Sequence, residues 1–233
     1  MVIGSVTQGL IALAAALAAL AGFVTLEGFF RNKLKELFED LDYFVFFFLV
    51  WGYLLYAVGE VSFYLTKFVF EDTSLLGIQD VYWSGGAFLS VVSFIALAMM
   101  LYRRHPHSGK ALSHLLVGSG VVLFVVLLLF GLIKPATTFG YAYPILSSLI
   151  VAFGLSVFFF LRELHDFGMS LQFFFIASSF ILVGDLFFAF TAAQSGYGAV
   201  TLIGDLAYLV GYVFSAIAFV VLRLRMHSLA FEE

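Results

Sequence analysis

The chain is poor in charged residues and has no cysteine. Only 11% of its 233 residues are charged, less than half of the roughly 25% that is usual in soluble domains. The absence of cysteine excludes disulfide bonds, thiolate catalysis and cysteine-ligated metal centres. The small net charge of −4 and the lack of a basic patch argue against a nucleic-acid partner.

Apolar residues dominate the composition instead. They make up 63% of the chain, which contains 31 phenylalanines and has a mean hydropathy of +1.10. A soluble core of this size could not bury so much apolar surface, so lipid must be the surrounding solvent. We therefore expect a multi-pass protein of the cell membrane, in contact with the lipid bilayer.

A helix needs about 20 predominantly apolar residues to cross a bilayer. The chain has seven such segments: Ser5–Phe30, Leu41–Leu65, Val81–Tyr102, Ser113–Ile133, Pro144–Leu161, Ser170–Ala192 and Val200–Leu224. Their short, polar connections predict an all-α membrane protein, a single seven-transmembrane helix bundle over residues 1–233. The first basic residue, Arg31, follows the first apolar segment, which is therefore expected to be a permanent span and not a signal peptide.

The basic residues predict the orientation of this bundle. Lys67 and Lys134 fall on one side of the membrane. The other nine of the eleven fall on the opposite side: Arg31, Lys33, Lys35, Arg103, Arg104, Lys110, Arg162, Arg223 and Arg225. Because cytoplasmic connections carry an excess of basic residues, the N-terminus is expected outside and the C-terminus in the cytoplasm.

Two features of the predicted cytoplasmic connections concern helix formation and metal binding. The segment Arg31–Asp40 has leucine and phenylalanine at helical spacing, which fits either an interfacial helix or an extension of a neighbouring span. Four histidines are expected in these connections: His105, His107, His114 and His165. The pair His105-Pro-His107 has metal-binding side chains, but exposed histidines are more often only solvated, and we predict no metal site.

Three carboxylates are expected inside the spans, namely Glu60, Asp185 and Asp205. No lysine, arginine or histidine is expected at a similar depth. An ionisable residue in hydrocarbon is costly and is a functional candidate for that reason. At about 1.5 Å per residue, all three lie roughly 8–10 Å below the outer boundary. Their common depth predicts one site that opens outward.

Tyrosines recur at helical spacing with these carboxylates. Tyr53, Tyr56 and Tyr64 share a face with Glu60 on the second span, while Tyr208 and Tyr212 share one with Asp205 on the seventh. Lipid cannot satisfy such groups, so these faces should point into the bundle. The predicted ligand-binding residues are therefore Glu60, Asp185, Asp205, Tyr56, Tyr64, Tyr208 and Tyr212.

A structural role is the alternative for the same residues. Each carboxyl group would then be neutral and hydrogen-bonded to a tyrosine, a serine or a backbone carbonyl, tying helices together. A glycine precedes each aspartate, Gly184 before Asp185 and Gly204 before Asp205. These glycines would allow neighbouring helices to approach closely beside the carboxylates.

Several catalytic and cofactor patterns are missing. The seventh span has no lysine that could hold retinal as a Schiff base, as microbial rhodopsins do, and no buried histidines are expected that could form an intramembrane zinc site. The G-x-S-x-G elbow, the P-loop and the H-E-x-x-H motif are also missing. We therefore expect no enzyme activity, and the sequence identifies no cofactor.

The last two spans resemble a known class of membrane module. Leu182-Val-Gly-Asp-Leu-Phe-Phe-Ala-Phe, Gly196-Tyr-Gly and Gly204-Asp-Leu-Ala-Tyr-Leu-Val-Gly-Tyr resemble the end of multi-helix sensor regions that precede histidine kinase or diguanylate cyclase domains in bacteria and archaea. The resemblance covers about 40 residues. It implies a sensor that signals to the cytoplasm, and an output domain would be expected to follow the last span. This sequence ends eight residues after Arg225. The output is therefore expected to come from a separate partner.

The sequence thus favours a membrane receptor or sensor-like protein. It would bind a small ligand or a cation from the outer side and relay a helix shift to a cytoplasmic signalling partner. An ion- or proton-coupled transporter using the same carboxylates is the main alternative, and a structural membrane subunit is another. The prolines favour binding, because Pro106, Pro135 and Pro144 are all expected near span ends, whereas transporters often have broken helices at mid-membrane.

The predicted orientation can be tested with reporter fusions at both ends of the chain. A reporter that works only in the cytoplasm should be active at the C-terminus and inactive at the N-terminus, because the basic residues hold their connections inside. A C-terminal fusion that is active only outside the cell would contradict the orientation.

Overall fold

The computed structural model describes residues 2–30, 41–71, 77–105, 109–135, 137–160, 164, 168–191 and 197–229. Seven helices within these residues are long and apolar enough to cross a membrane, so the predicted all-α architecture with seven spans is confirmed. The segment Arg31–Asp40, His107 and His165 lie outside the described residues.

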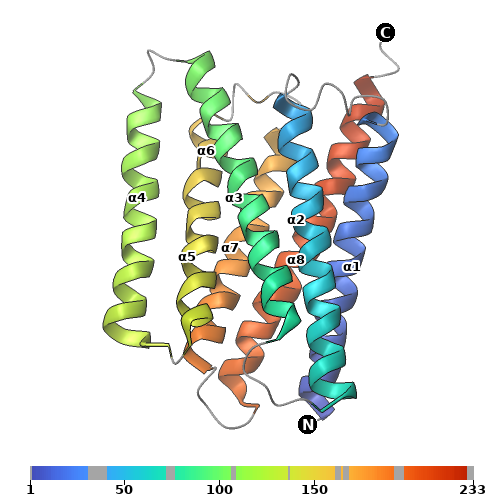
Figure 1. Cartoon of the computed structure of the whole chain (residues 1–233). Helices are drawn as coiled ribbons and strands as arrows, with labels where there is room; N and C mark the ends of the chain where they lie inside the picture. The colour runs from blue at the N-terminus through green and yellow to red at the C-terminus, as the bar shows by residue number, and fades with distance from the viewer. Residues whose placement is uncertain are drawn as a thin grey trace.

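The spans alternate in direction along the chain (Figure 1). Short π-helical turns, η2 and η3, extend the second and fourth spans, and a short helix, α6, follows the fifth. The elements are α1 (Val2–Phe30), α2 (Leu41–Tyr64), η2 (Leu65–Val69), α3 (Ile78–Arg104), α4 (Lys110–Leu128), η3 (Leu129–Ile133), α5 (Thr138–Gly154), α6 (Ser156–Phe159), α7 (Gly168–Thr191) and α8 (Ala199–Leu229). We call the end of the bundle at which α1 begins the N-terminal end.

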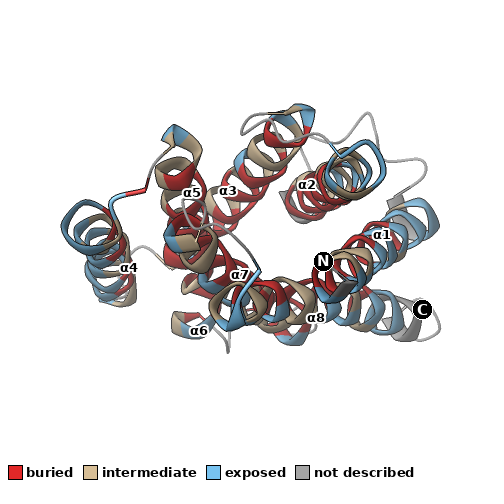
Figure 2. Ribbon diagram, turned by 90° about the horizontal axis from the view of Figure 1, so that it is seen from below, coloured by how far each residue is buried: buried red, intermediate tan, exposed pale blue. Residues whose placement is uncertain are grey.

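Six of these spans form a closed ring. Helix α1 packs on α2, α2 on α3, α3 on α5, α5 on α7 and α7 on α8, and α8 packs on α1 to close the ring. Figure 2 shows this ring along its axis, with α4 outside it. Helix α4 packs mainly on α5, and only 17% of its apolar window is buried, compared with 44–56% in the other spans. This order places α2 opposite α7, which hydropathy alone could not predict.

The fifth span begins earlier than the sequence predicts. We expected it to begin at Pro144, but α5 begins at Thr138 and contains Pro144 in its interior. The true start is capped by Thr137, whose hydroxyl accepts a hydrogen bond from the Gly140 N–H at 3.2 Å. We placed the boundary at Pro144 because proline is common at the first position of a helix. Inside α5 its missing N–H removes only one backbone hydrogen bond.

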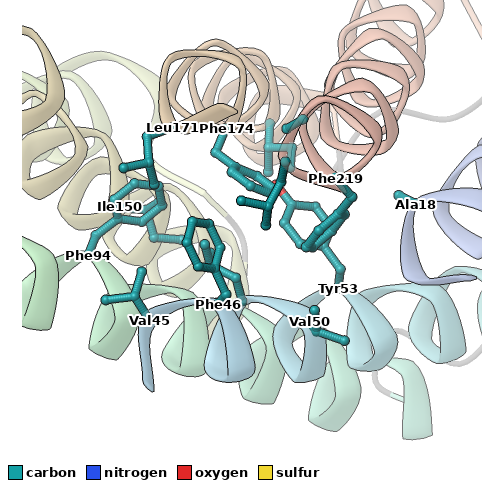
Figure 3. Packing of buried hydrophobic residues seen from close by; sticks show 14 of the residues in the cluster. Ala18, Val45, Phe46, Val50, Tyr53, Phe94, Ile150, Leu171, Phe174 and Phe219 are labelled. Carbon is teal, nitrogen blue, oxygen red and sulfur yellow. The ribbon is translucent and has the colours of Figure 1, made fainter. Parts of the chain in front are cut away.

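Aromatic and aliphatic side chains pack together in the half of the ring that lies away from the N-terminal end. Figure 3 shows part of this cluster from close by. Phe46, Phe174 and Phe219 come from the corresponding halves of α2, α7 and α8, and each is at most 3% exposed. The rings of Phe174 and Phe219 meet edge to face with centroids 4.7 Å apart, and Tyr53 packs against both. We call Tyr53, Phe174 and Phe219 the aromatic plug.

The outer helix α4 is attached to α5 through a histidine that we expected in a connection. His114 lies in the second turn of α4 and is only 1% exposed. Its Nε2 is 2.8 Å from the carbonyl oxygen of Ala152, which lies in the last turn of α5. Its Nδ1 bonds with the Tyr102 hydroxyl of α3. Carbonyls in a last helical turn lack intrahelical partners, so this side chain is drawn into the interior.

Replacing His114 with leucine should therefore destabilise the protein. The Ala152 carbonyl and the Tyr102 hydroxyl would lose their partner inside the bundle, at a cost of about 1–2 kcal/mol in the free energy of unfolding. Thermal unfolding in detergent would measure the loss. Ser113→Ala is the matched control, because Ser113 is exposed on the same turn, and it should change stability by less than about 0.5 kcal/mol. Equal effects of the two substitutions would contradict the proposed attachment.

Candidate functional site

A cavity of about 550 Å³ lies inside the ring, toward the N-terminal end. Each of the six ring helices contributes to its wall, and the described part of α4 contributes nothing. On α7 the lining residues are Ile181, Asp185, Phe188 and Thr191, which follow one another at helical spacing along one face. The cavity therefore follows the inner faces of the helices from the N-terminal end to about the middle of the bundle.

Four carboxylates line this cavity, and each accepts a hydrogen bond from a tyrosine hydroxyl. The pairs are Tyr212 to Glu60 at 2.8 Å, Tyr143 to Asp80 at 2.6 Å, Tyr208 to Asp185 at 2.6 Å and Tyr197 to Asp205 at 2.6 Å. We call these the four carboxylate–tyrosine pairs. Three of them join different helices, namely α2 with α8, α3 with α5, and α7 with α8.

Three of the carboxylates have a second hydrogen-bond donor. Asp185 accepts one from the Ser147 hydroxyl of α5, so it links three helices. Asp205 accepts one from Gln8 of α1 at 2.9 Å. The structural alternative is thus realised in part, because these bonds do tie the ring together. It does not account for the cavity between the bonded groups.

Asp80 is a site residue that the sequence reasoning missed. We expected the third span to begin at Val81, but α3 begins at Ile78 and places Asp80 in its first turn, only 5% exposed. The Asp80 carboxylate reaches back to accept a hydrogen bond from the Gly77 N–H at 2.7 Å. An acidic residue three positions after the cap residue, just before an apolar run, is a recognised helix-start pattern that could have located it.

The structure places most of the predicted ligand-binding residues on the wall of this one cavity. They are Glu60, Asp185, Asp205, Tyr56, Tyr208 and Tyr212. Tyr64 is not part of the wall; its ring lies against Gly9 of α1 and against Phe68. Gln8, Tyr143 and Ser147 were not predicted, because the sequence does not show which faces of α1 and α5 point inward.

Glycines make room for the bulky side chains around the carboxylates. A Cβ atom on Gly184 would lie 2.8 Å from the Tyr208 ring, and one on Gly59 would lie 2.6 Å from the Trp83 ring. A Cβ on Gly204 would lie 2.8 Å from Phe187. The glycines before the two aspartates therefore allow the close helix approach that the sequence predicted.

Two polar atoms at the cavity have no hydrogen-bond partner among the described residues. One is the side-chain oxygen Oε1 of Gln79, a residue that is only 6% exposed. The other is the indole N–H of Trp83, which lies near Glu60 on the cavity wall. Buried polar atoms are nearly always paired in proteins, so these two are the groups of the cavity wall whose hydrogen bonding is incomplete.

The cavity wall is strongly acidic. Lys67 of η2 is the one basic residue among the described residues that line it, against four carboxylates. None of these carboxylates forms an ion pair with a described residue. Burial and the neighbouring Asp205 raise the pKa of Tyr197, which lies just before α8, so its phenol stays protonated and able to donate.

Comparison with known proteins adds no relationship. No protein-family model matches the chain, and neither a curated protein nor a solved structure shows significant similarity to it.

Removing one hydroxyl from the carboxylate–tyrosine pairs should weaken the ring. Tyr212→Phe takes away the hydrogen bond that Glu60 accepts and should lower the free energy of unfolding by about 1–3 kcal/mol. Tyr64→Phe is the matched control, since the Tyr64 hydroxyl forms no hydrogen bond with a described residue, and it should change stability by less than about 0.5 kcal/mol. Thermal unfolding in detergent would measure both, and equal effects would contradict a stabilising role for the pair.

Proposed function

We propose that this multi-pass membrane protein is a receptor that takes a small polar ligand into the cavity from the N-terminal end. The observation that carries the proposal is the cavity itself, with its four carboxylates and its unpaired Gln79 oxygen. A volume of about 550 Å³ lies within the range of roughly 300–1,000 Å³ that is typical of small-molecule sites. No catalytic activity is proposed, and the membrane is taken to be the cell membrane.

The closed end of the cavity supports binding over transport. Its deepest lining residues include Tyr56, Ile181 and Tyr212. About one helical turn farther along α2, and two turns farther along α7 and α8, the residues of the aromatic plug pack against one another and are at most 3% exposed. A transporter needs polar groups along a path to both sides of the membrane. The polar side chains that line this cavity lie toward one side of the membrane, and the aromatic plug separates them from the other side.

Helix α8 is the element best placed to relay binding. It carries Asp205, Tyr208 and Tyr212 on the cavity wall and Phe219 in the aromatic plug. The Phe219 carbonyl also accepts a hydrogen bond from Thr25 of α1 at 3.3 Å. A ligand that competes for the tyrosine hydroxyls would move α8, and this movement would reach the opposite end of the bundle. The resemblance of α7 and α8 to sensor regions supports the same role, with a cytoplasmic signalling partner.

The absence of cysteine makes the proposal directly testable with introduced thiols. Phe188→Cys would place a thiol on the cavity wall, while Ala177→Cys would place one on the same helix in the core, where Ala177 is fully buried. A membrane-impermeant cationic methanethiosulfonate reagent should modify the cysteine at position 188 from the N-terminal side alone. It should modify the cysteine at position 177 from neither side.

The sidedness of the reaction separates the alternatives. Intact cells and inside-out vesicles expose opposite faces to the reagent, and mass spectrometry of the purified chain measures modification. Reaction at position 188 from both faces, or at position 177 from the face opposite the cavity, would favour a transporter. No reaction at position 188 from either face would contradict an accessible binding cavity.

A further inference from the structure

The charge of the cavity limits the ligands that it can take. Four carboxylates face one lysine among the described lining residues, and that lysine, Lys67, is exposed at the N-terminal end of the cavity. Carboxylates surrounded by apolar material must be neutralised by protons or by cations. An anionic ligand would add to the charge that has to be neutralised, whereas a cation with more than one positive charge would reduce it.

The spacing of the carboxylates disfavours a metal ion as this cation. They come from α2, α3, α7 and α8. Among the described residues, no group of three or more histidine, cysteine, aspartate or glutamate side chains is arranged to hold a metal. Divalent cations such as Ca²⁺ require about six to eight oxygens at about 2.3–2.6 Å from a single point. Acids that are distributed around a large cavity fit instead a ligand that carries separate positive groups.

Aromatic rings line the wall between the acids. Trp83 packs against Phe63 and Tyr143, with ring centroids 5.4 and 6.0 Å apart, and Tyr56 and Phe188 also line the cavity. Ring faces attract ammonium groups through cation–π interactions and give methylene chains an apolar surface. The wall therefore suits an organic cation that has both charged ends and an apolar middle.

The unpaired acceptor at the cavity points in the same direction. Gln79 is only 6% exposed, and its side-chain oxygen Oε1 lacks a hydrogen-bond donor among the described residues. Glu60 accepts one hydrogen bond from a described residue, that of Tyr212, on Oε1. An ammonium group has three N–H donors and no acceptor. It can therefore supply a donor to a carboxylate and, once the Gln79 amide turns toward the cavity, another to the Gln79 oxygen.

We infer that the cavity binds a small organic dication, of the class of aliphatic diamines whose two ammonium groups are joined by a short methylene chain. The inference rests on the proposed function, because it specifies the ligand of the same cavity. One ammonium group is held by the carboxylates of α7 and α8, and the other by Glu60 or Asp80 with the Gln79 oxygen. The methylene chain lies against the aromatic wall between them.

Binding of 1,4-diaminobutane to the full chain in lipid nanodiscs tests the inference. Calorimetry and the thermal unfolding temperature would be measured in parallel with three matched compounds. Butylamine has one charge, 1,4-butanediol has none, and MgCl₂ supplies a compact dication. We expect the diamine to bind and to raise the unfolding temperature, butylamine to bind about tenfold or more weakly because it loses one charge-assisted contact, and the other two to have no effect.

Charge-removing variants locate the binding. Asp185→Asn should weaken diamine binding about tenfold or more, while Glu27→Gln, which removes an exposed carboxylate at the opposite end of α1, should leave it unchanged. Asp205→Asn serves the same purpose if Asp185→Asn does not fold. Equal binding of butylamine and the diamine, a response to MgCl₂, or equal binding by the Asp and Glu27 variants would each overturn the inference.

The thiol-labelling result keeps this inference separate from the proposed function. If the cysteine at position 188 is modified from the N-terminal side but no amine binds, the receptor cavity stands and the diamine class is wrong. If the cysteine is not modified and no amine binds, both proposals fail.

Discussion

A carboxyl group held in an apolar medium must be given partners, and the ring is arranged around that requirement. Apolar side chains attract one another little more than they attract lipid, so they do not by themselves fix which helix faces which. Hydrogen bonds do. The bonds that Asp185 accepts from Ser147 and Tyr208 connect α5, α7 and α8, and the Tyr212–Glu60 bond brings α8 to α2. The carboxylate–tyrosine pairs thus tie several helices of the ring together around its cavity.

The same helices serve different purposes along their length. Toward the N-terminal end their inner faces carry carboxylates and hydroxyls around open space, and toward the other end they carry the aromatic plug. Helix α8 shows this most clearly, because Asp205 and Tyr208 lie on the cavity and Phe219 lies in the plug. A binding half that adjusts and a packed half that resists deformation are what a relay across a membrane needs.

The sequence predicts where the helices lie along the chain, but it does not predict which helices pack against one another. Hydropathy located all seven spans, and helical spacing placed Glu60, Tyr56 and the tyrosines of α8 on inward faces, although Tyr64 is not on the cavity wall. Asp80 was missed because a boundary error of three residues put it in a connection. His114 was misplaced because composition does not reveal a carbonyl on another helix that needs a donor. Tyr143 could not be found, since its role depends on α5 packing beside α3, which is a property of the bundle order.

The closure of the ring by α1 and α8 has a consequence for the biosynthesis of the protein. Helix α1 leaves the ribosome first, yet its partner α8 follows only after all the other spans. Until α8 is inserted, Gln8 cannot donate its hydrogen bond to Asp205, and Glu60 lacks the hydrogen bond from Tyr212. During insertion these polar groups must be shielded by water at the translocon, by a membrane chaperone or by temporary contacts between early helices. The cavity is therefore complete only once α8 has joined the other helices of the ring.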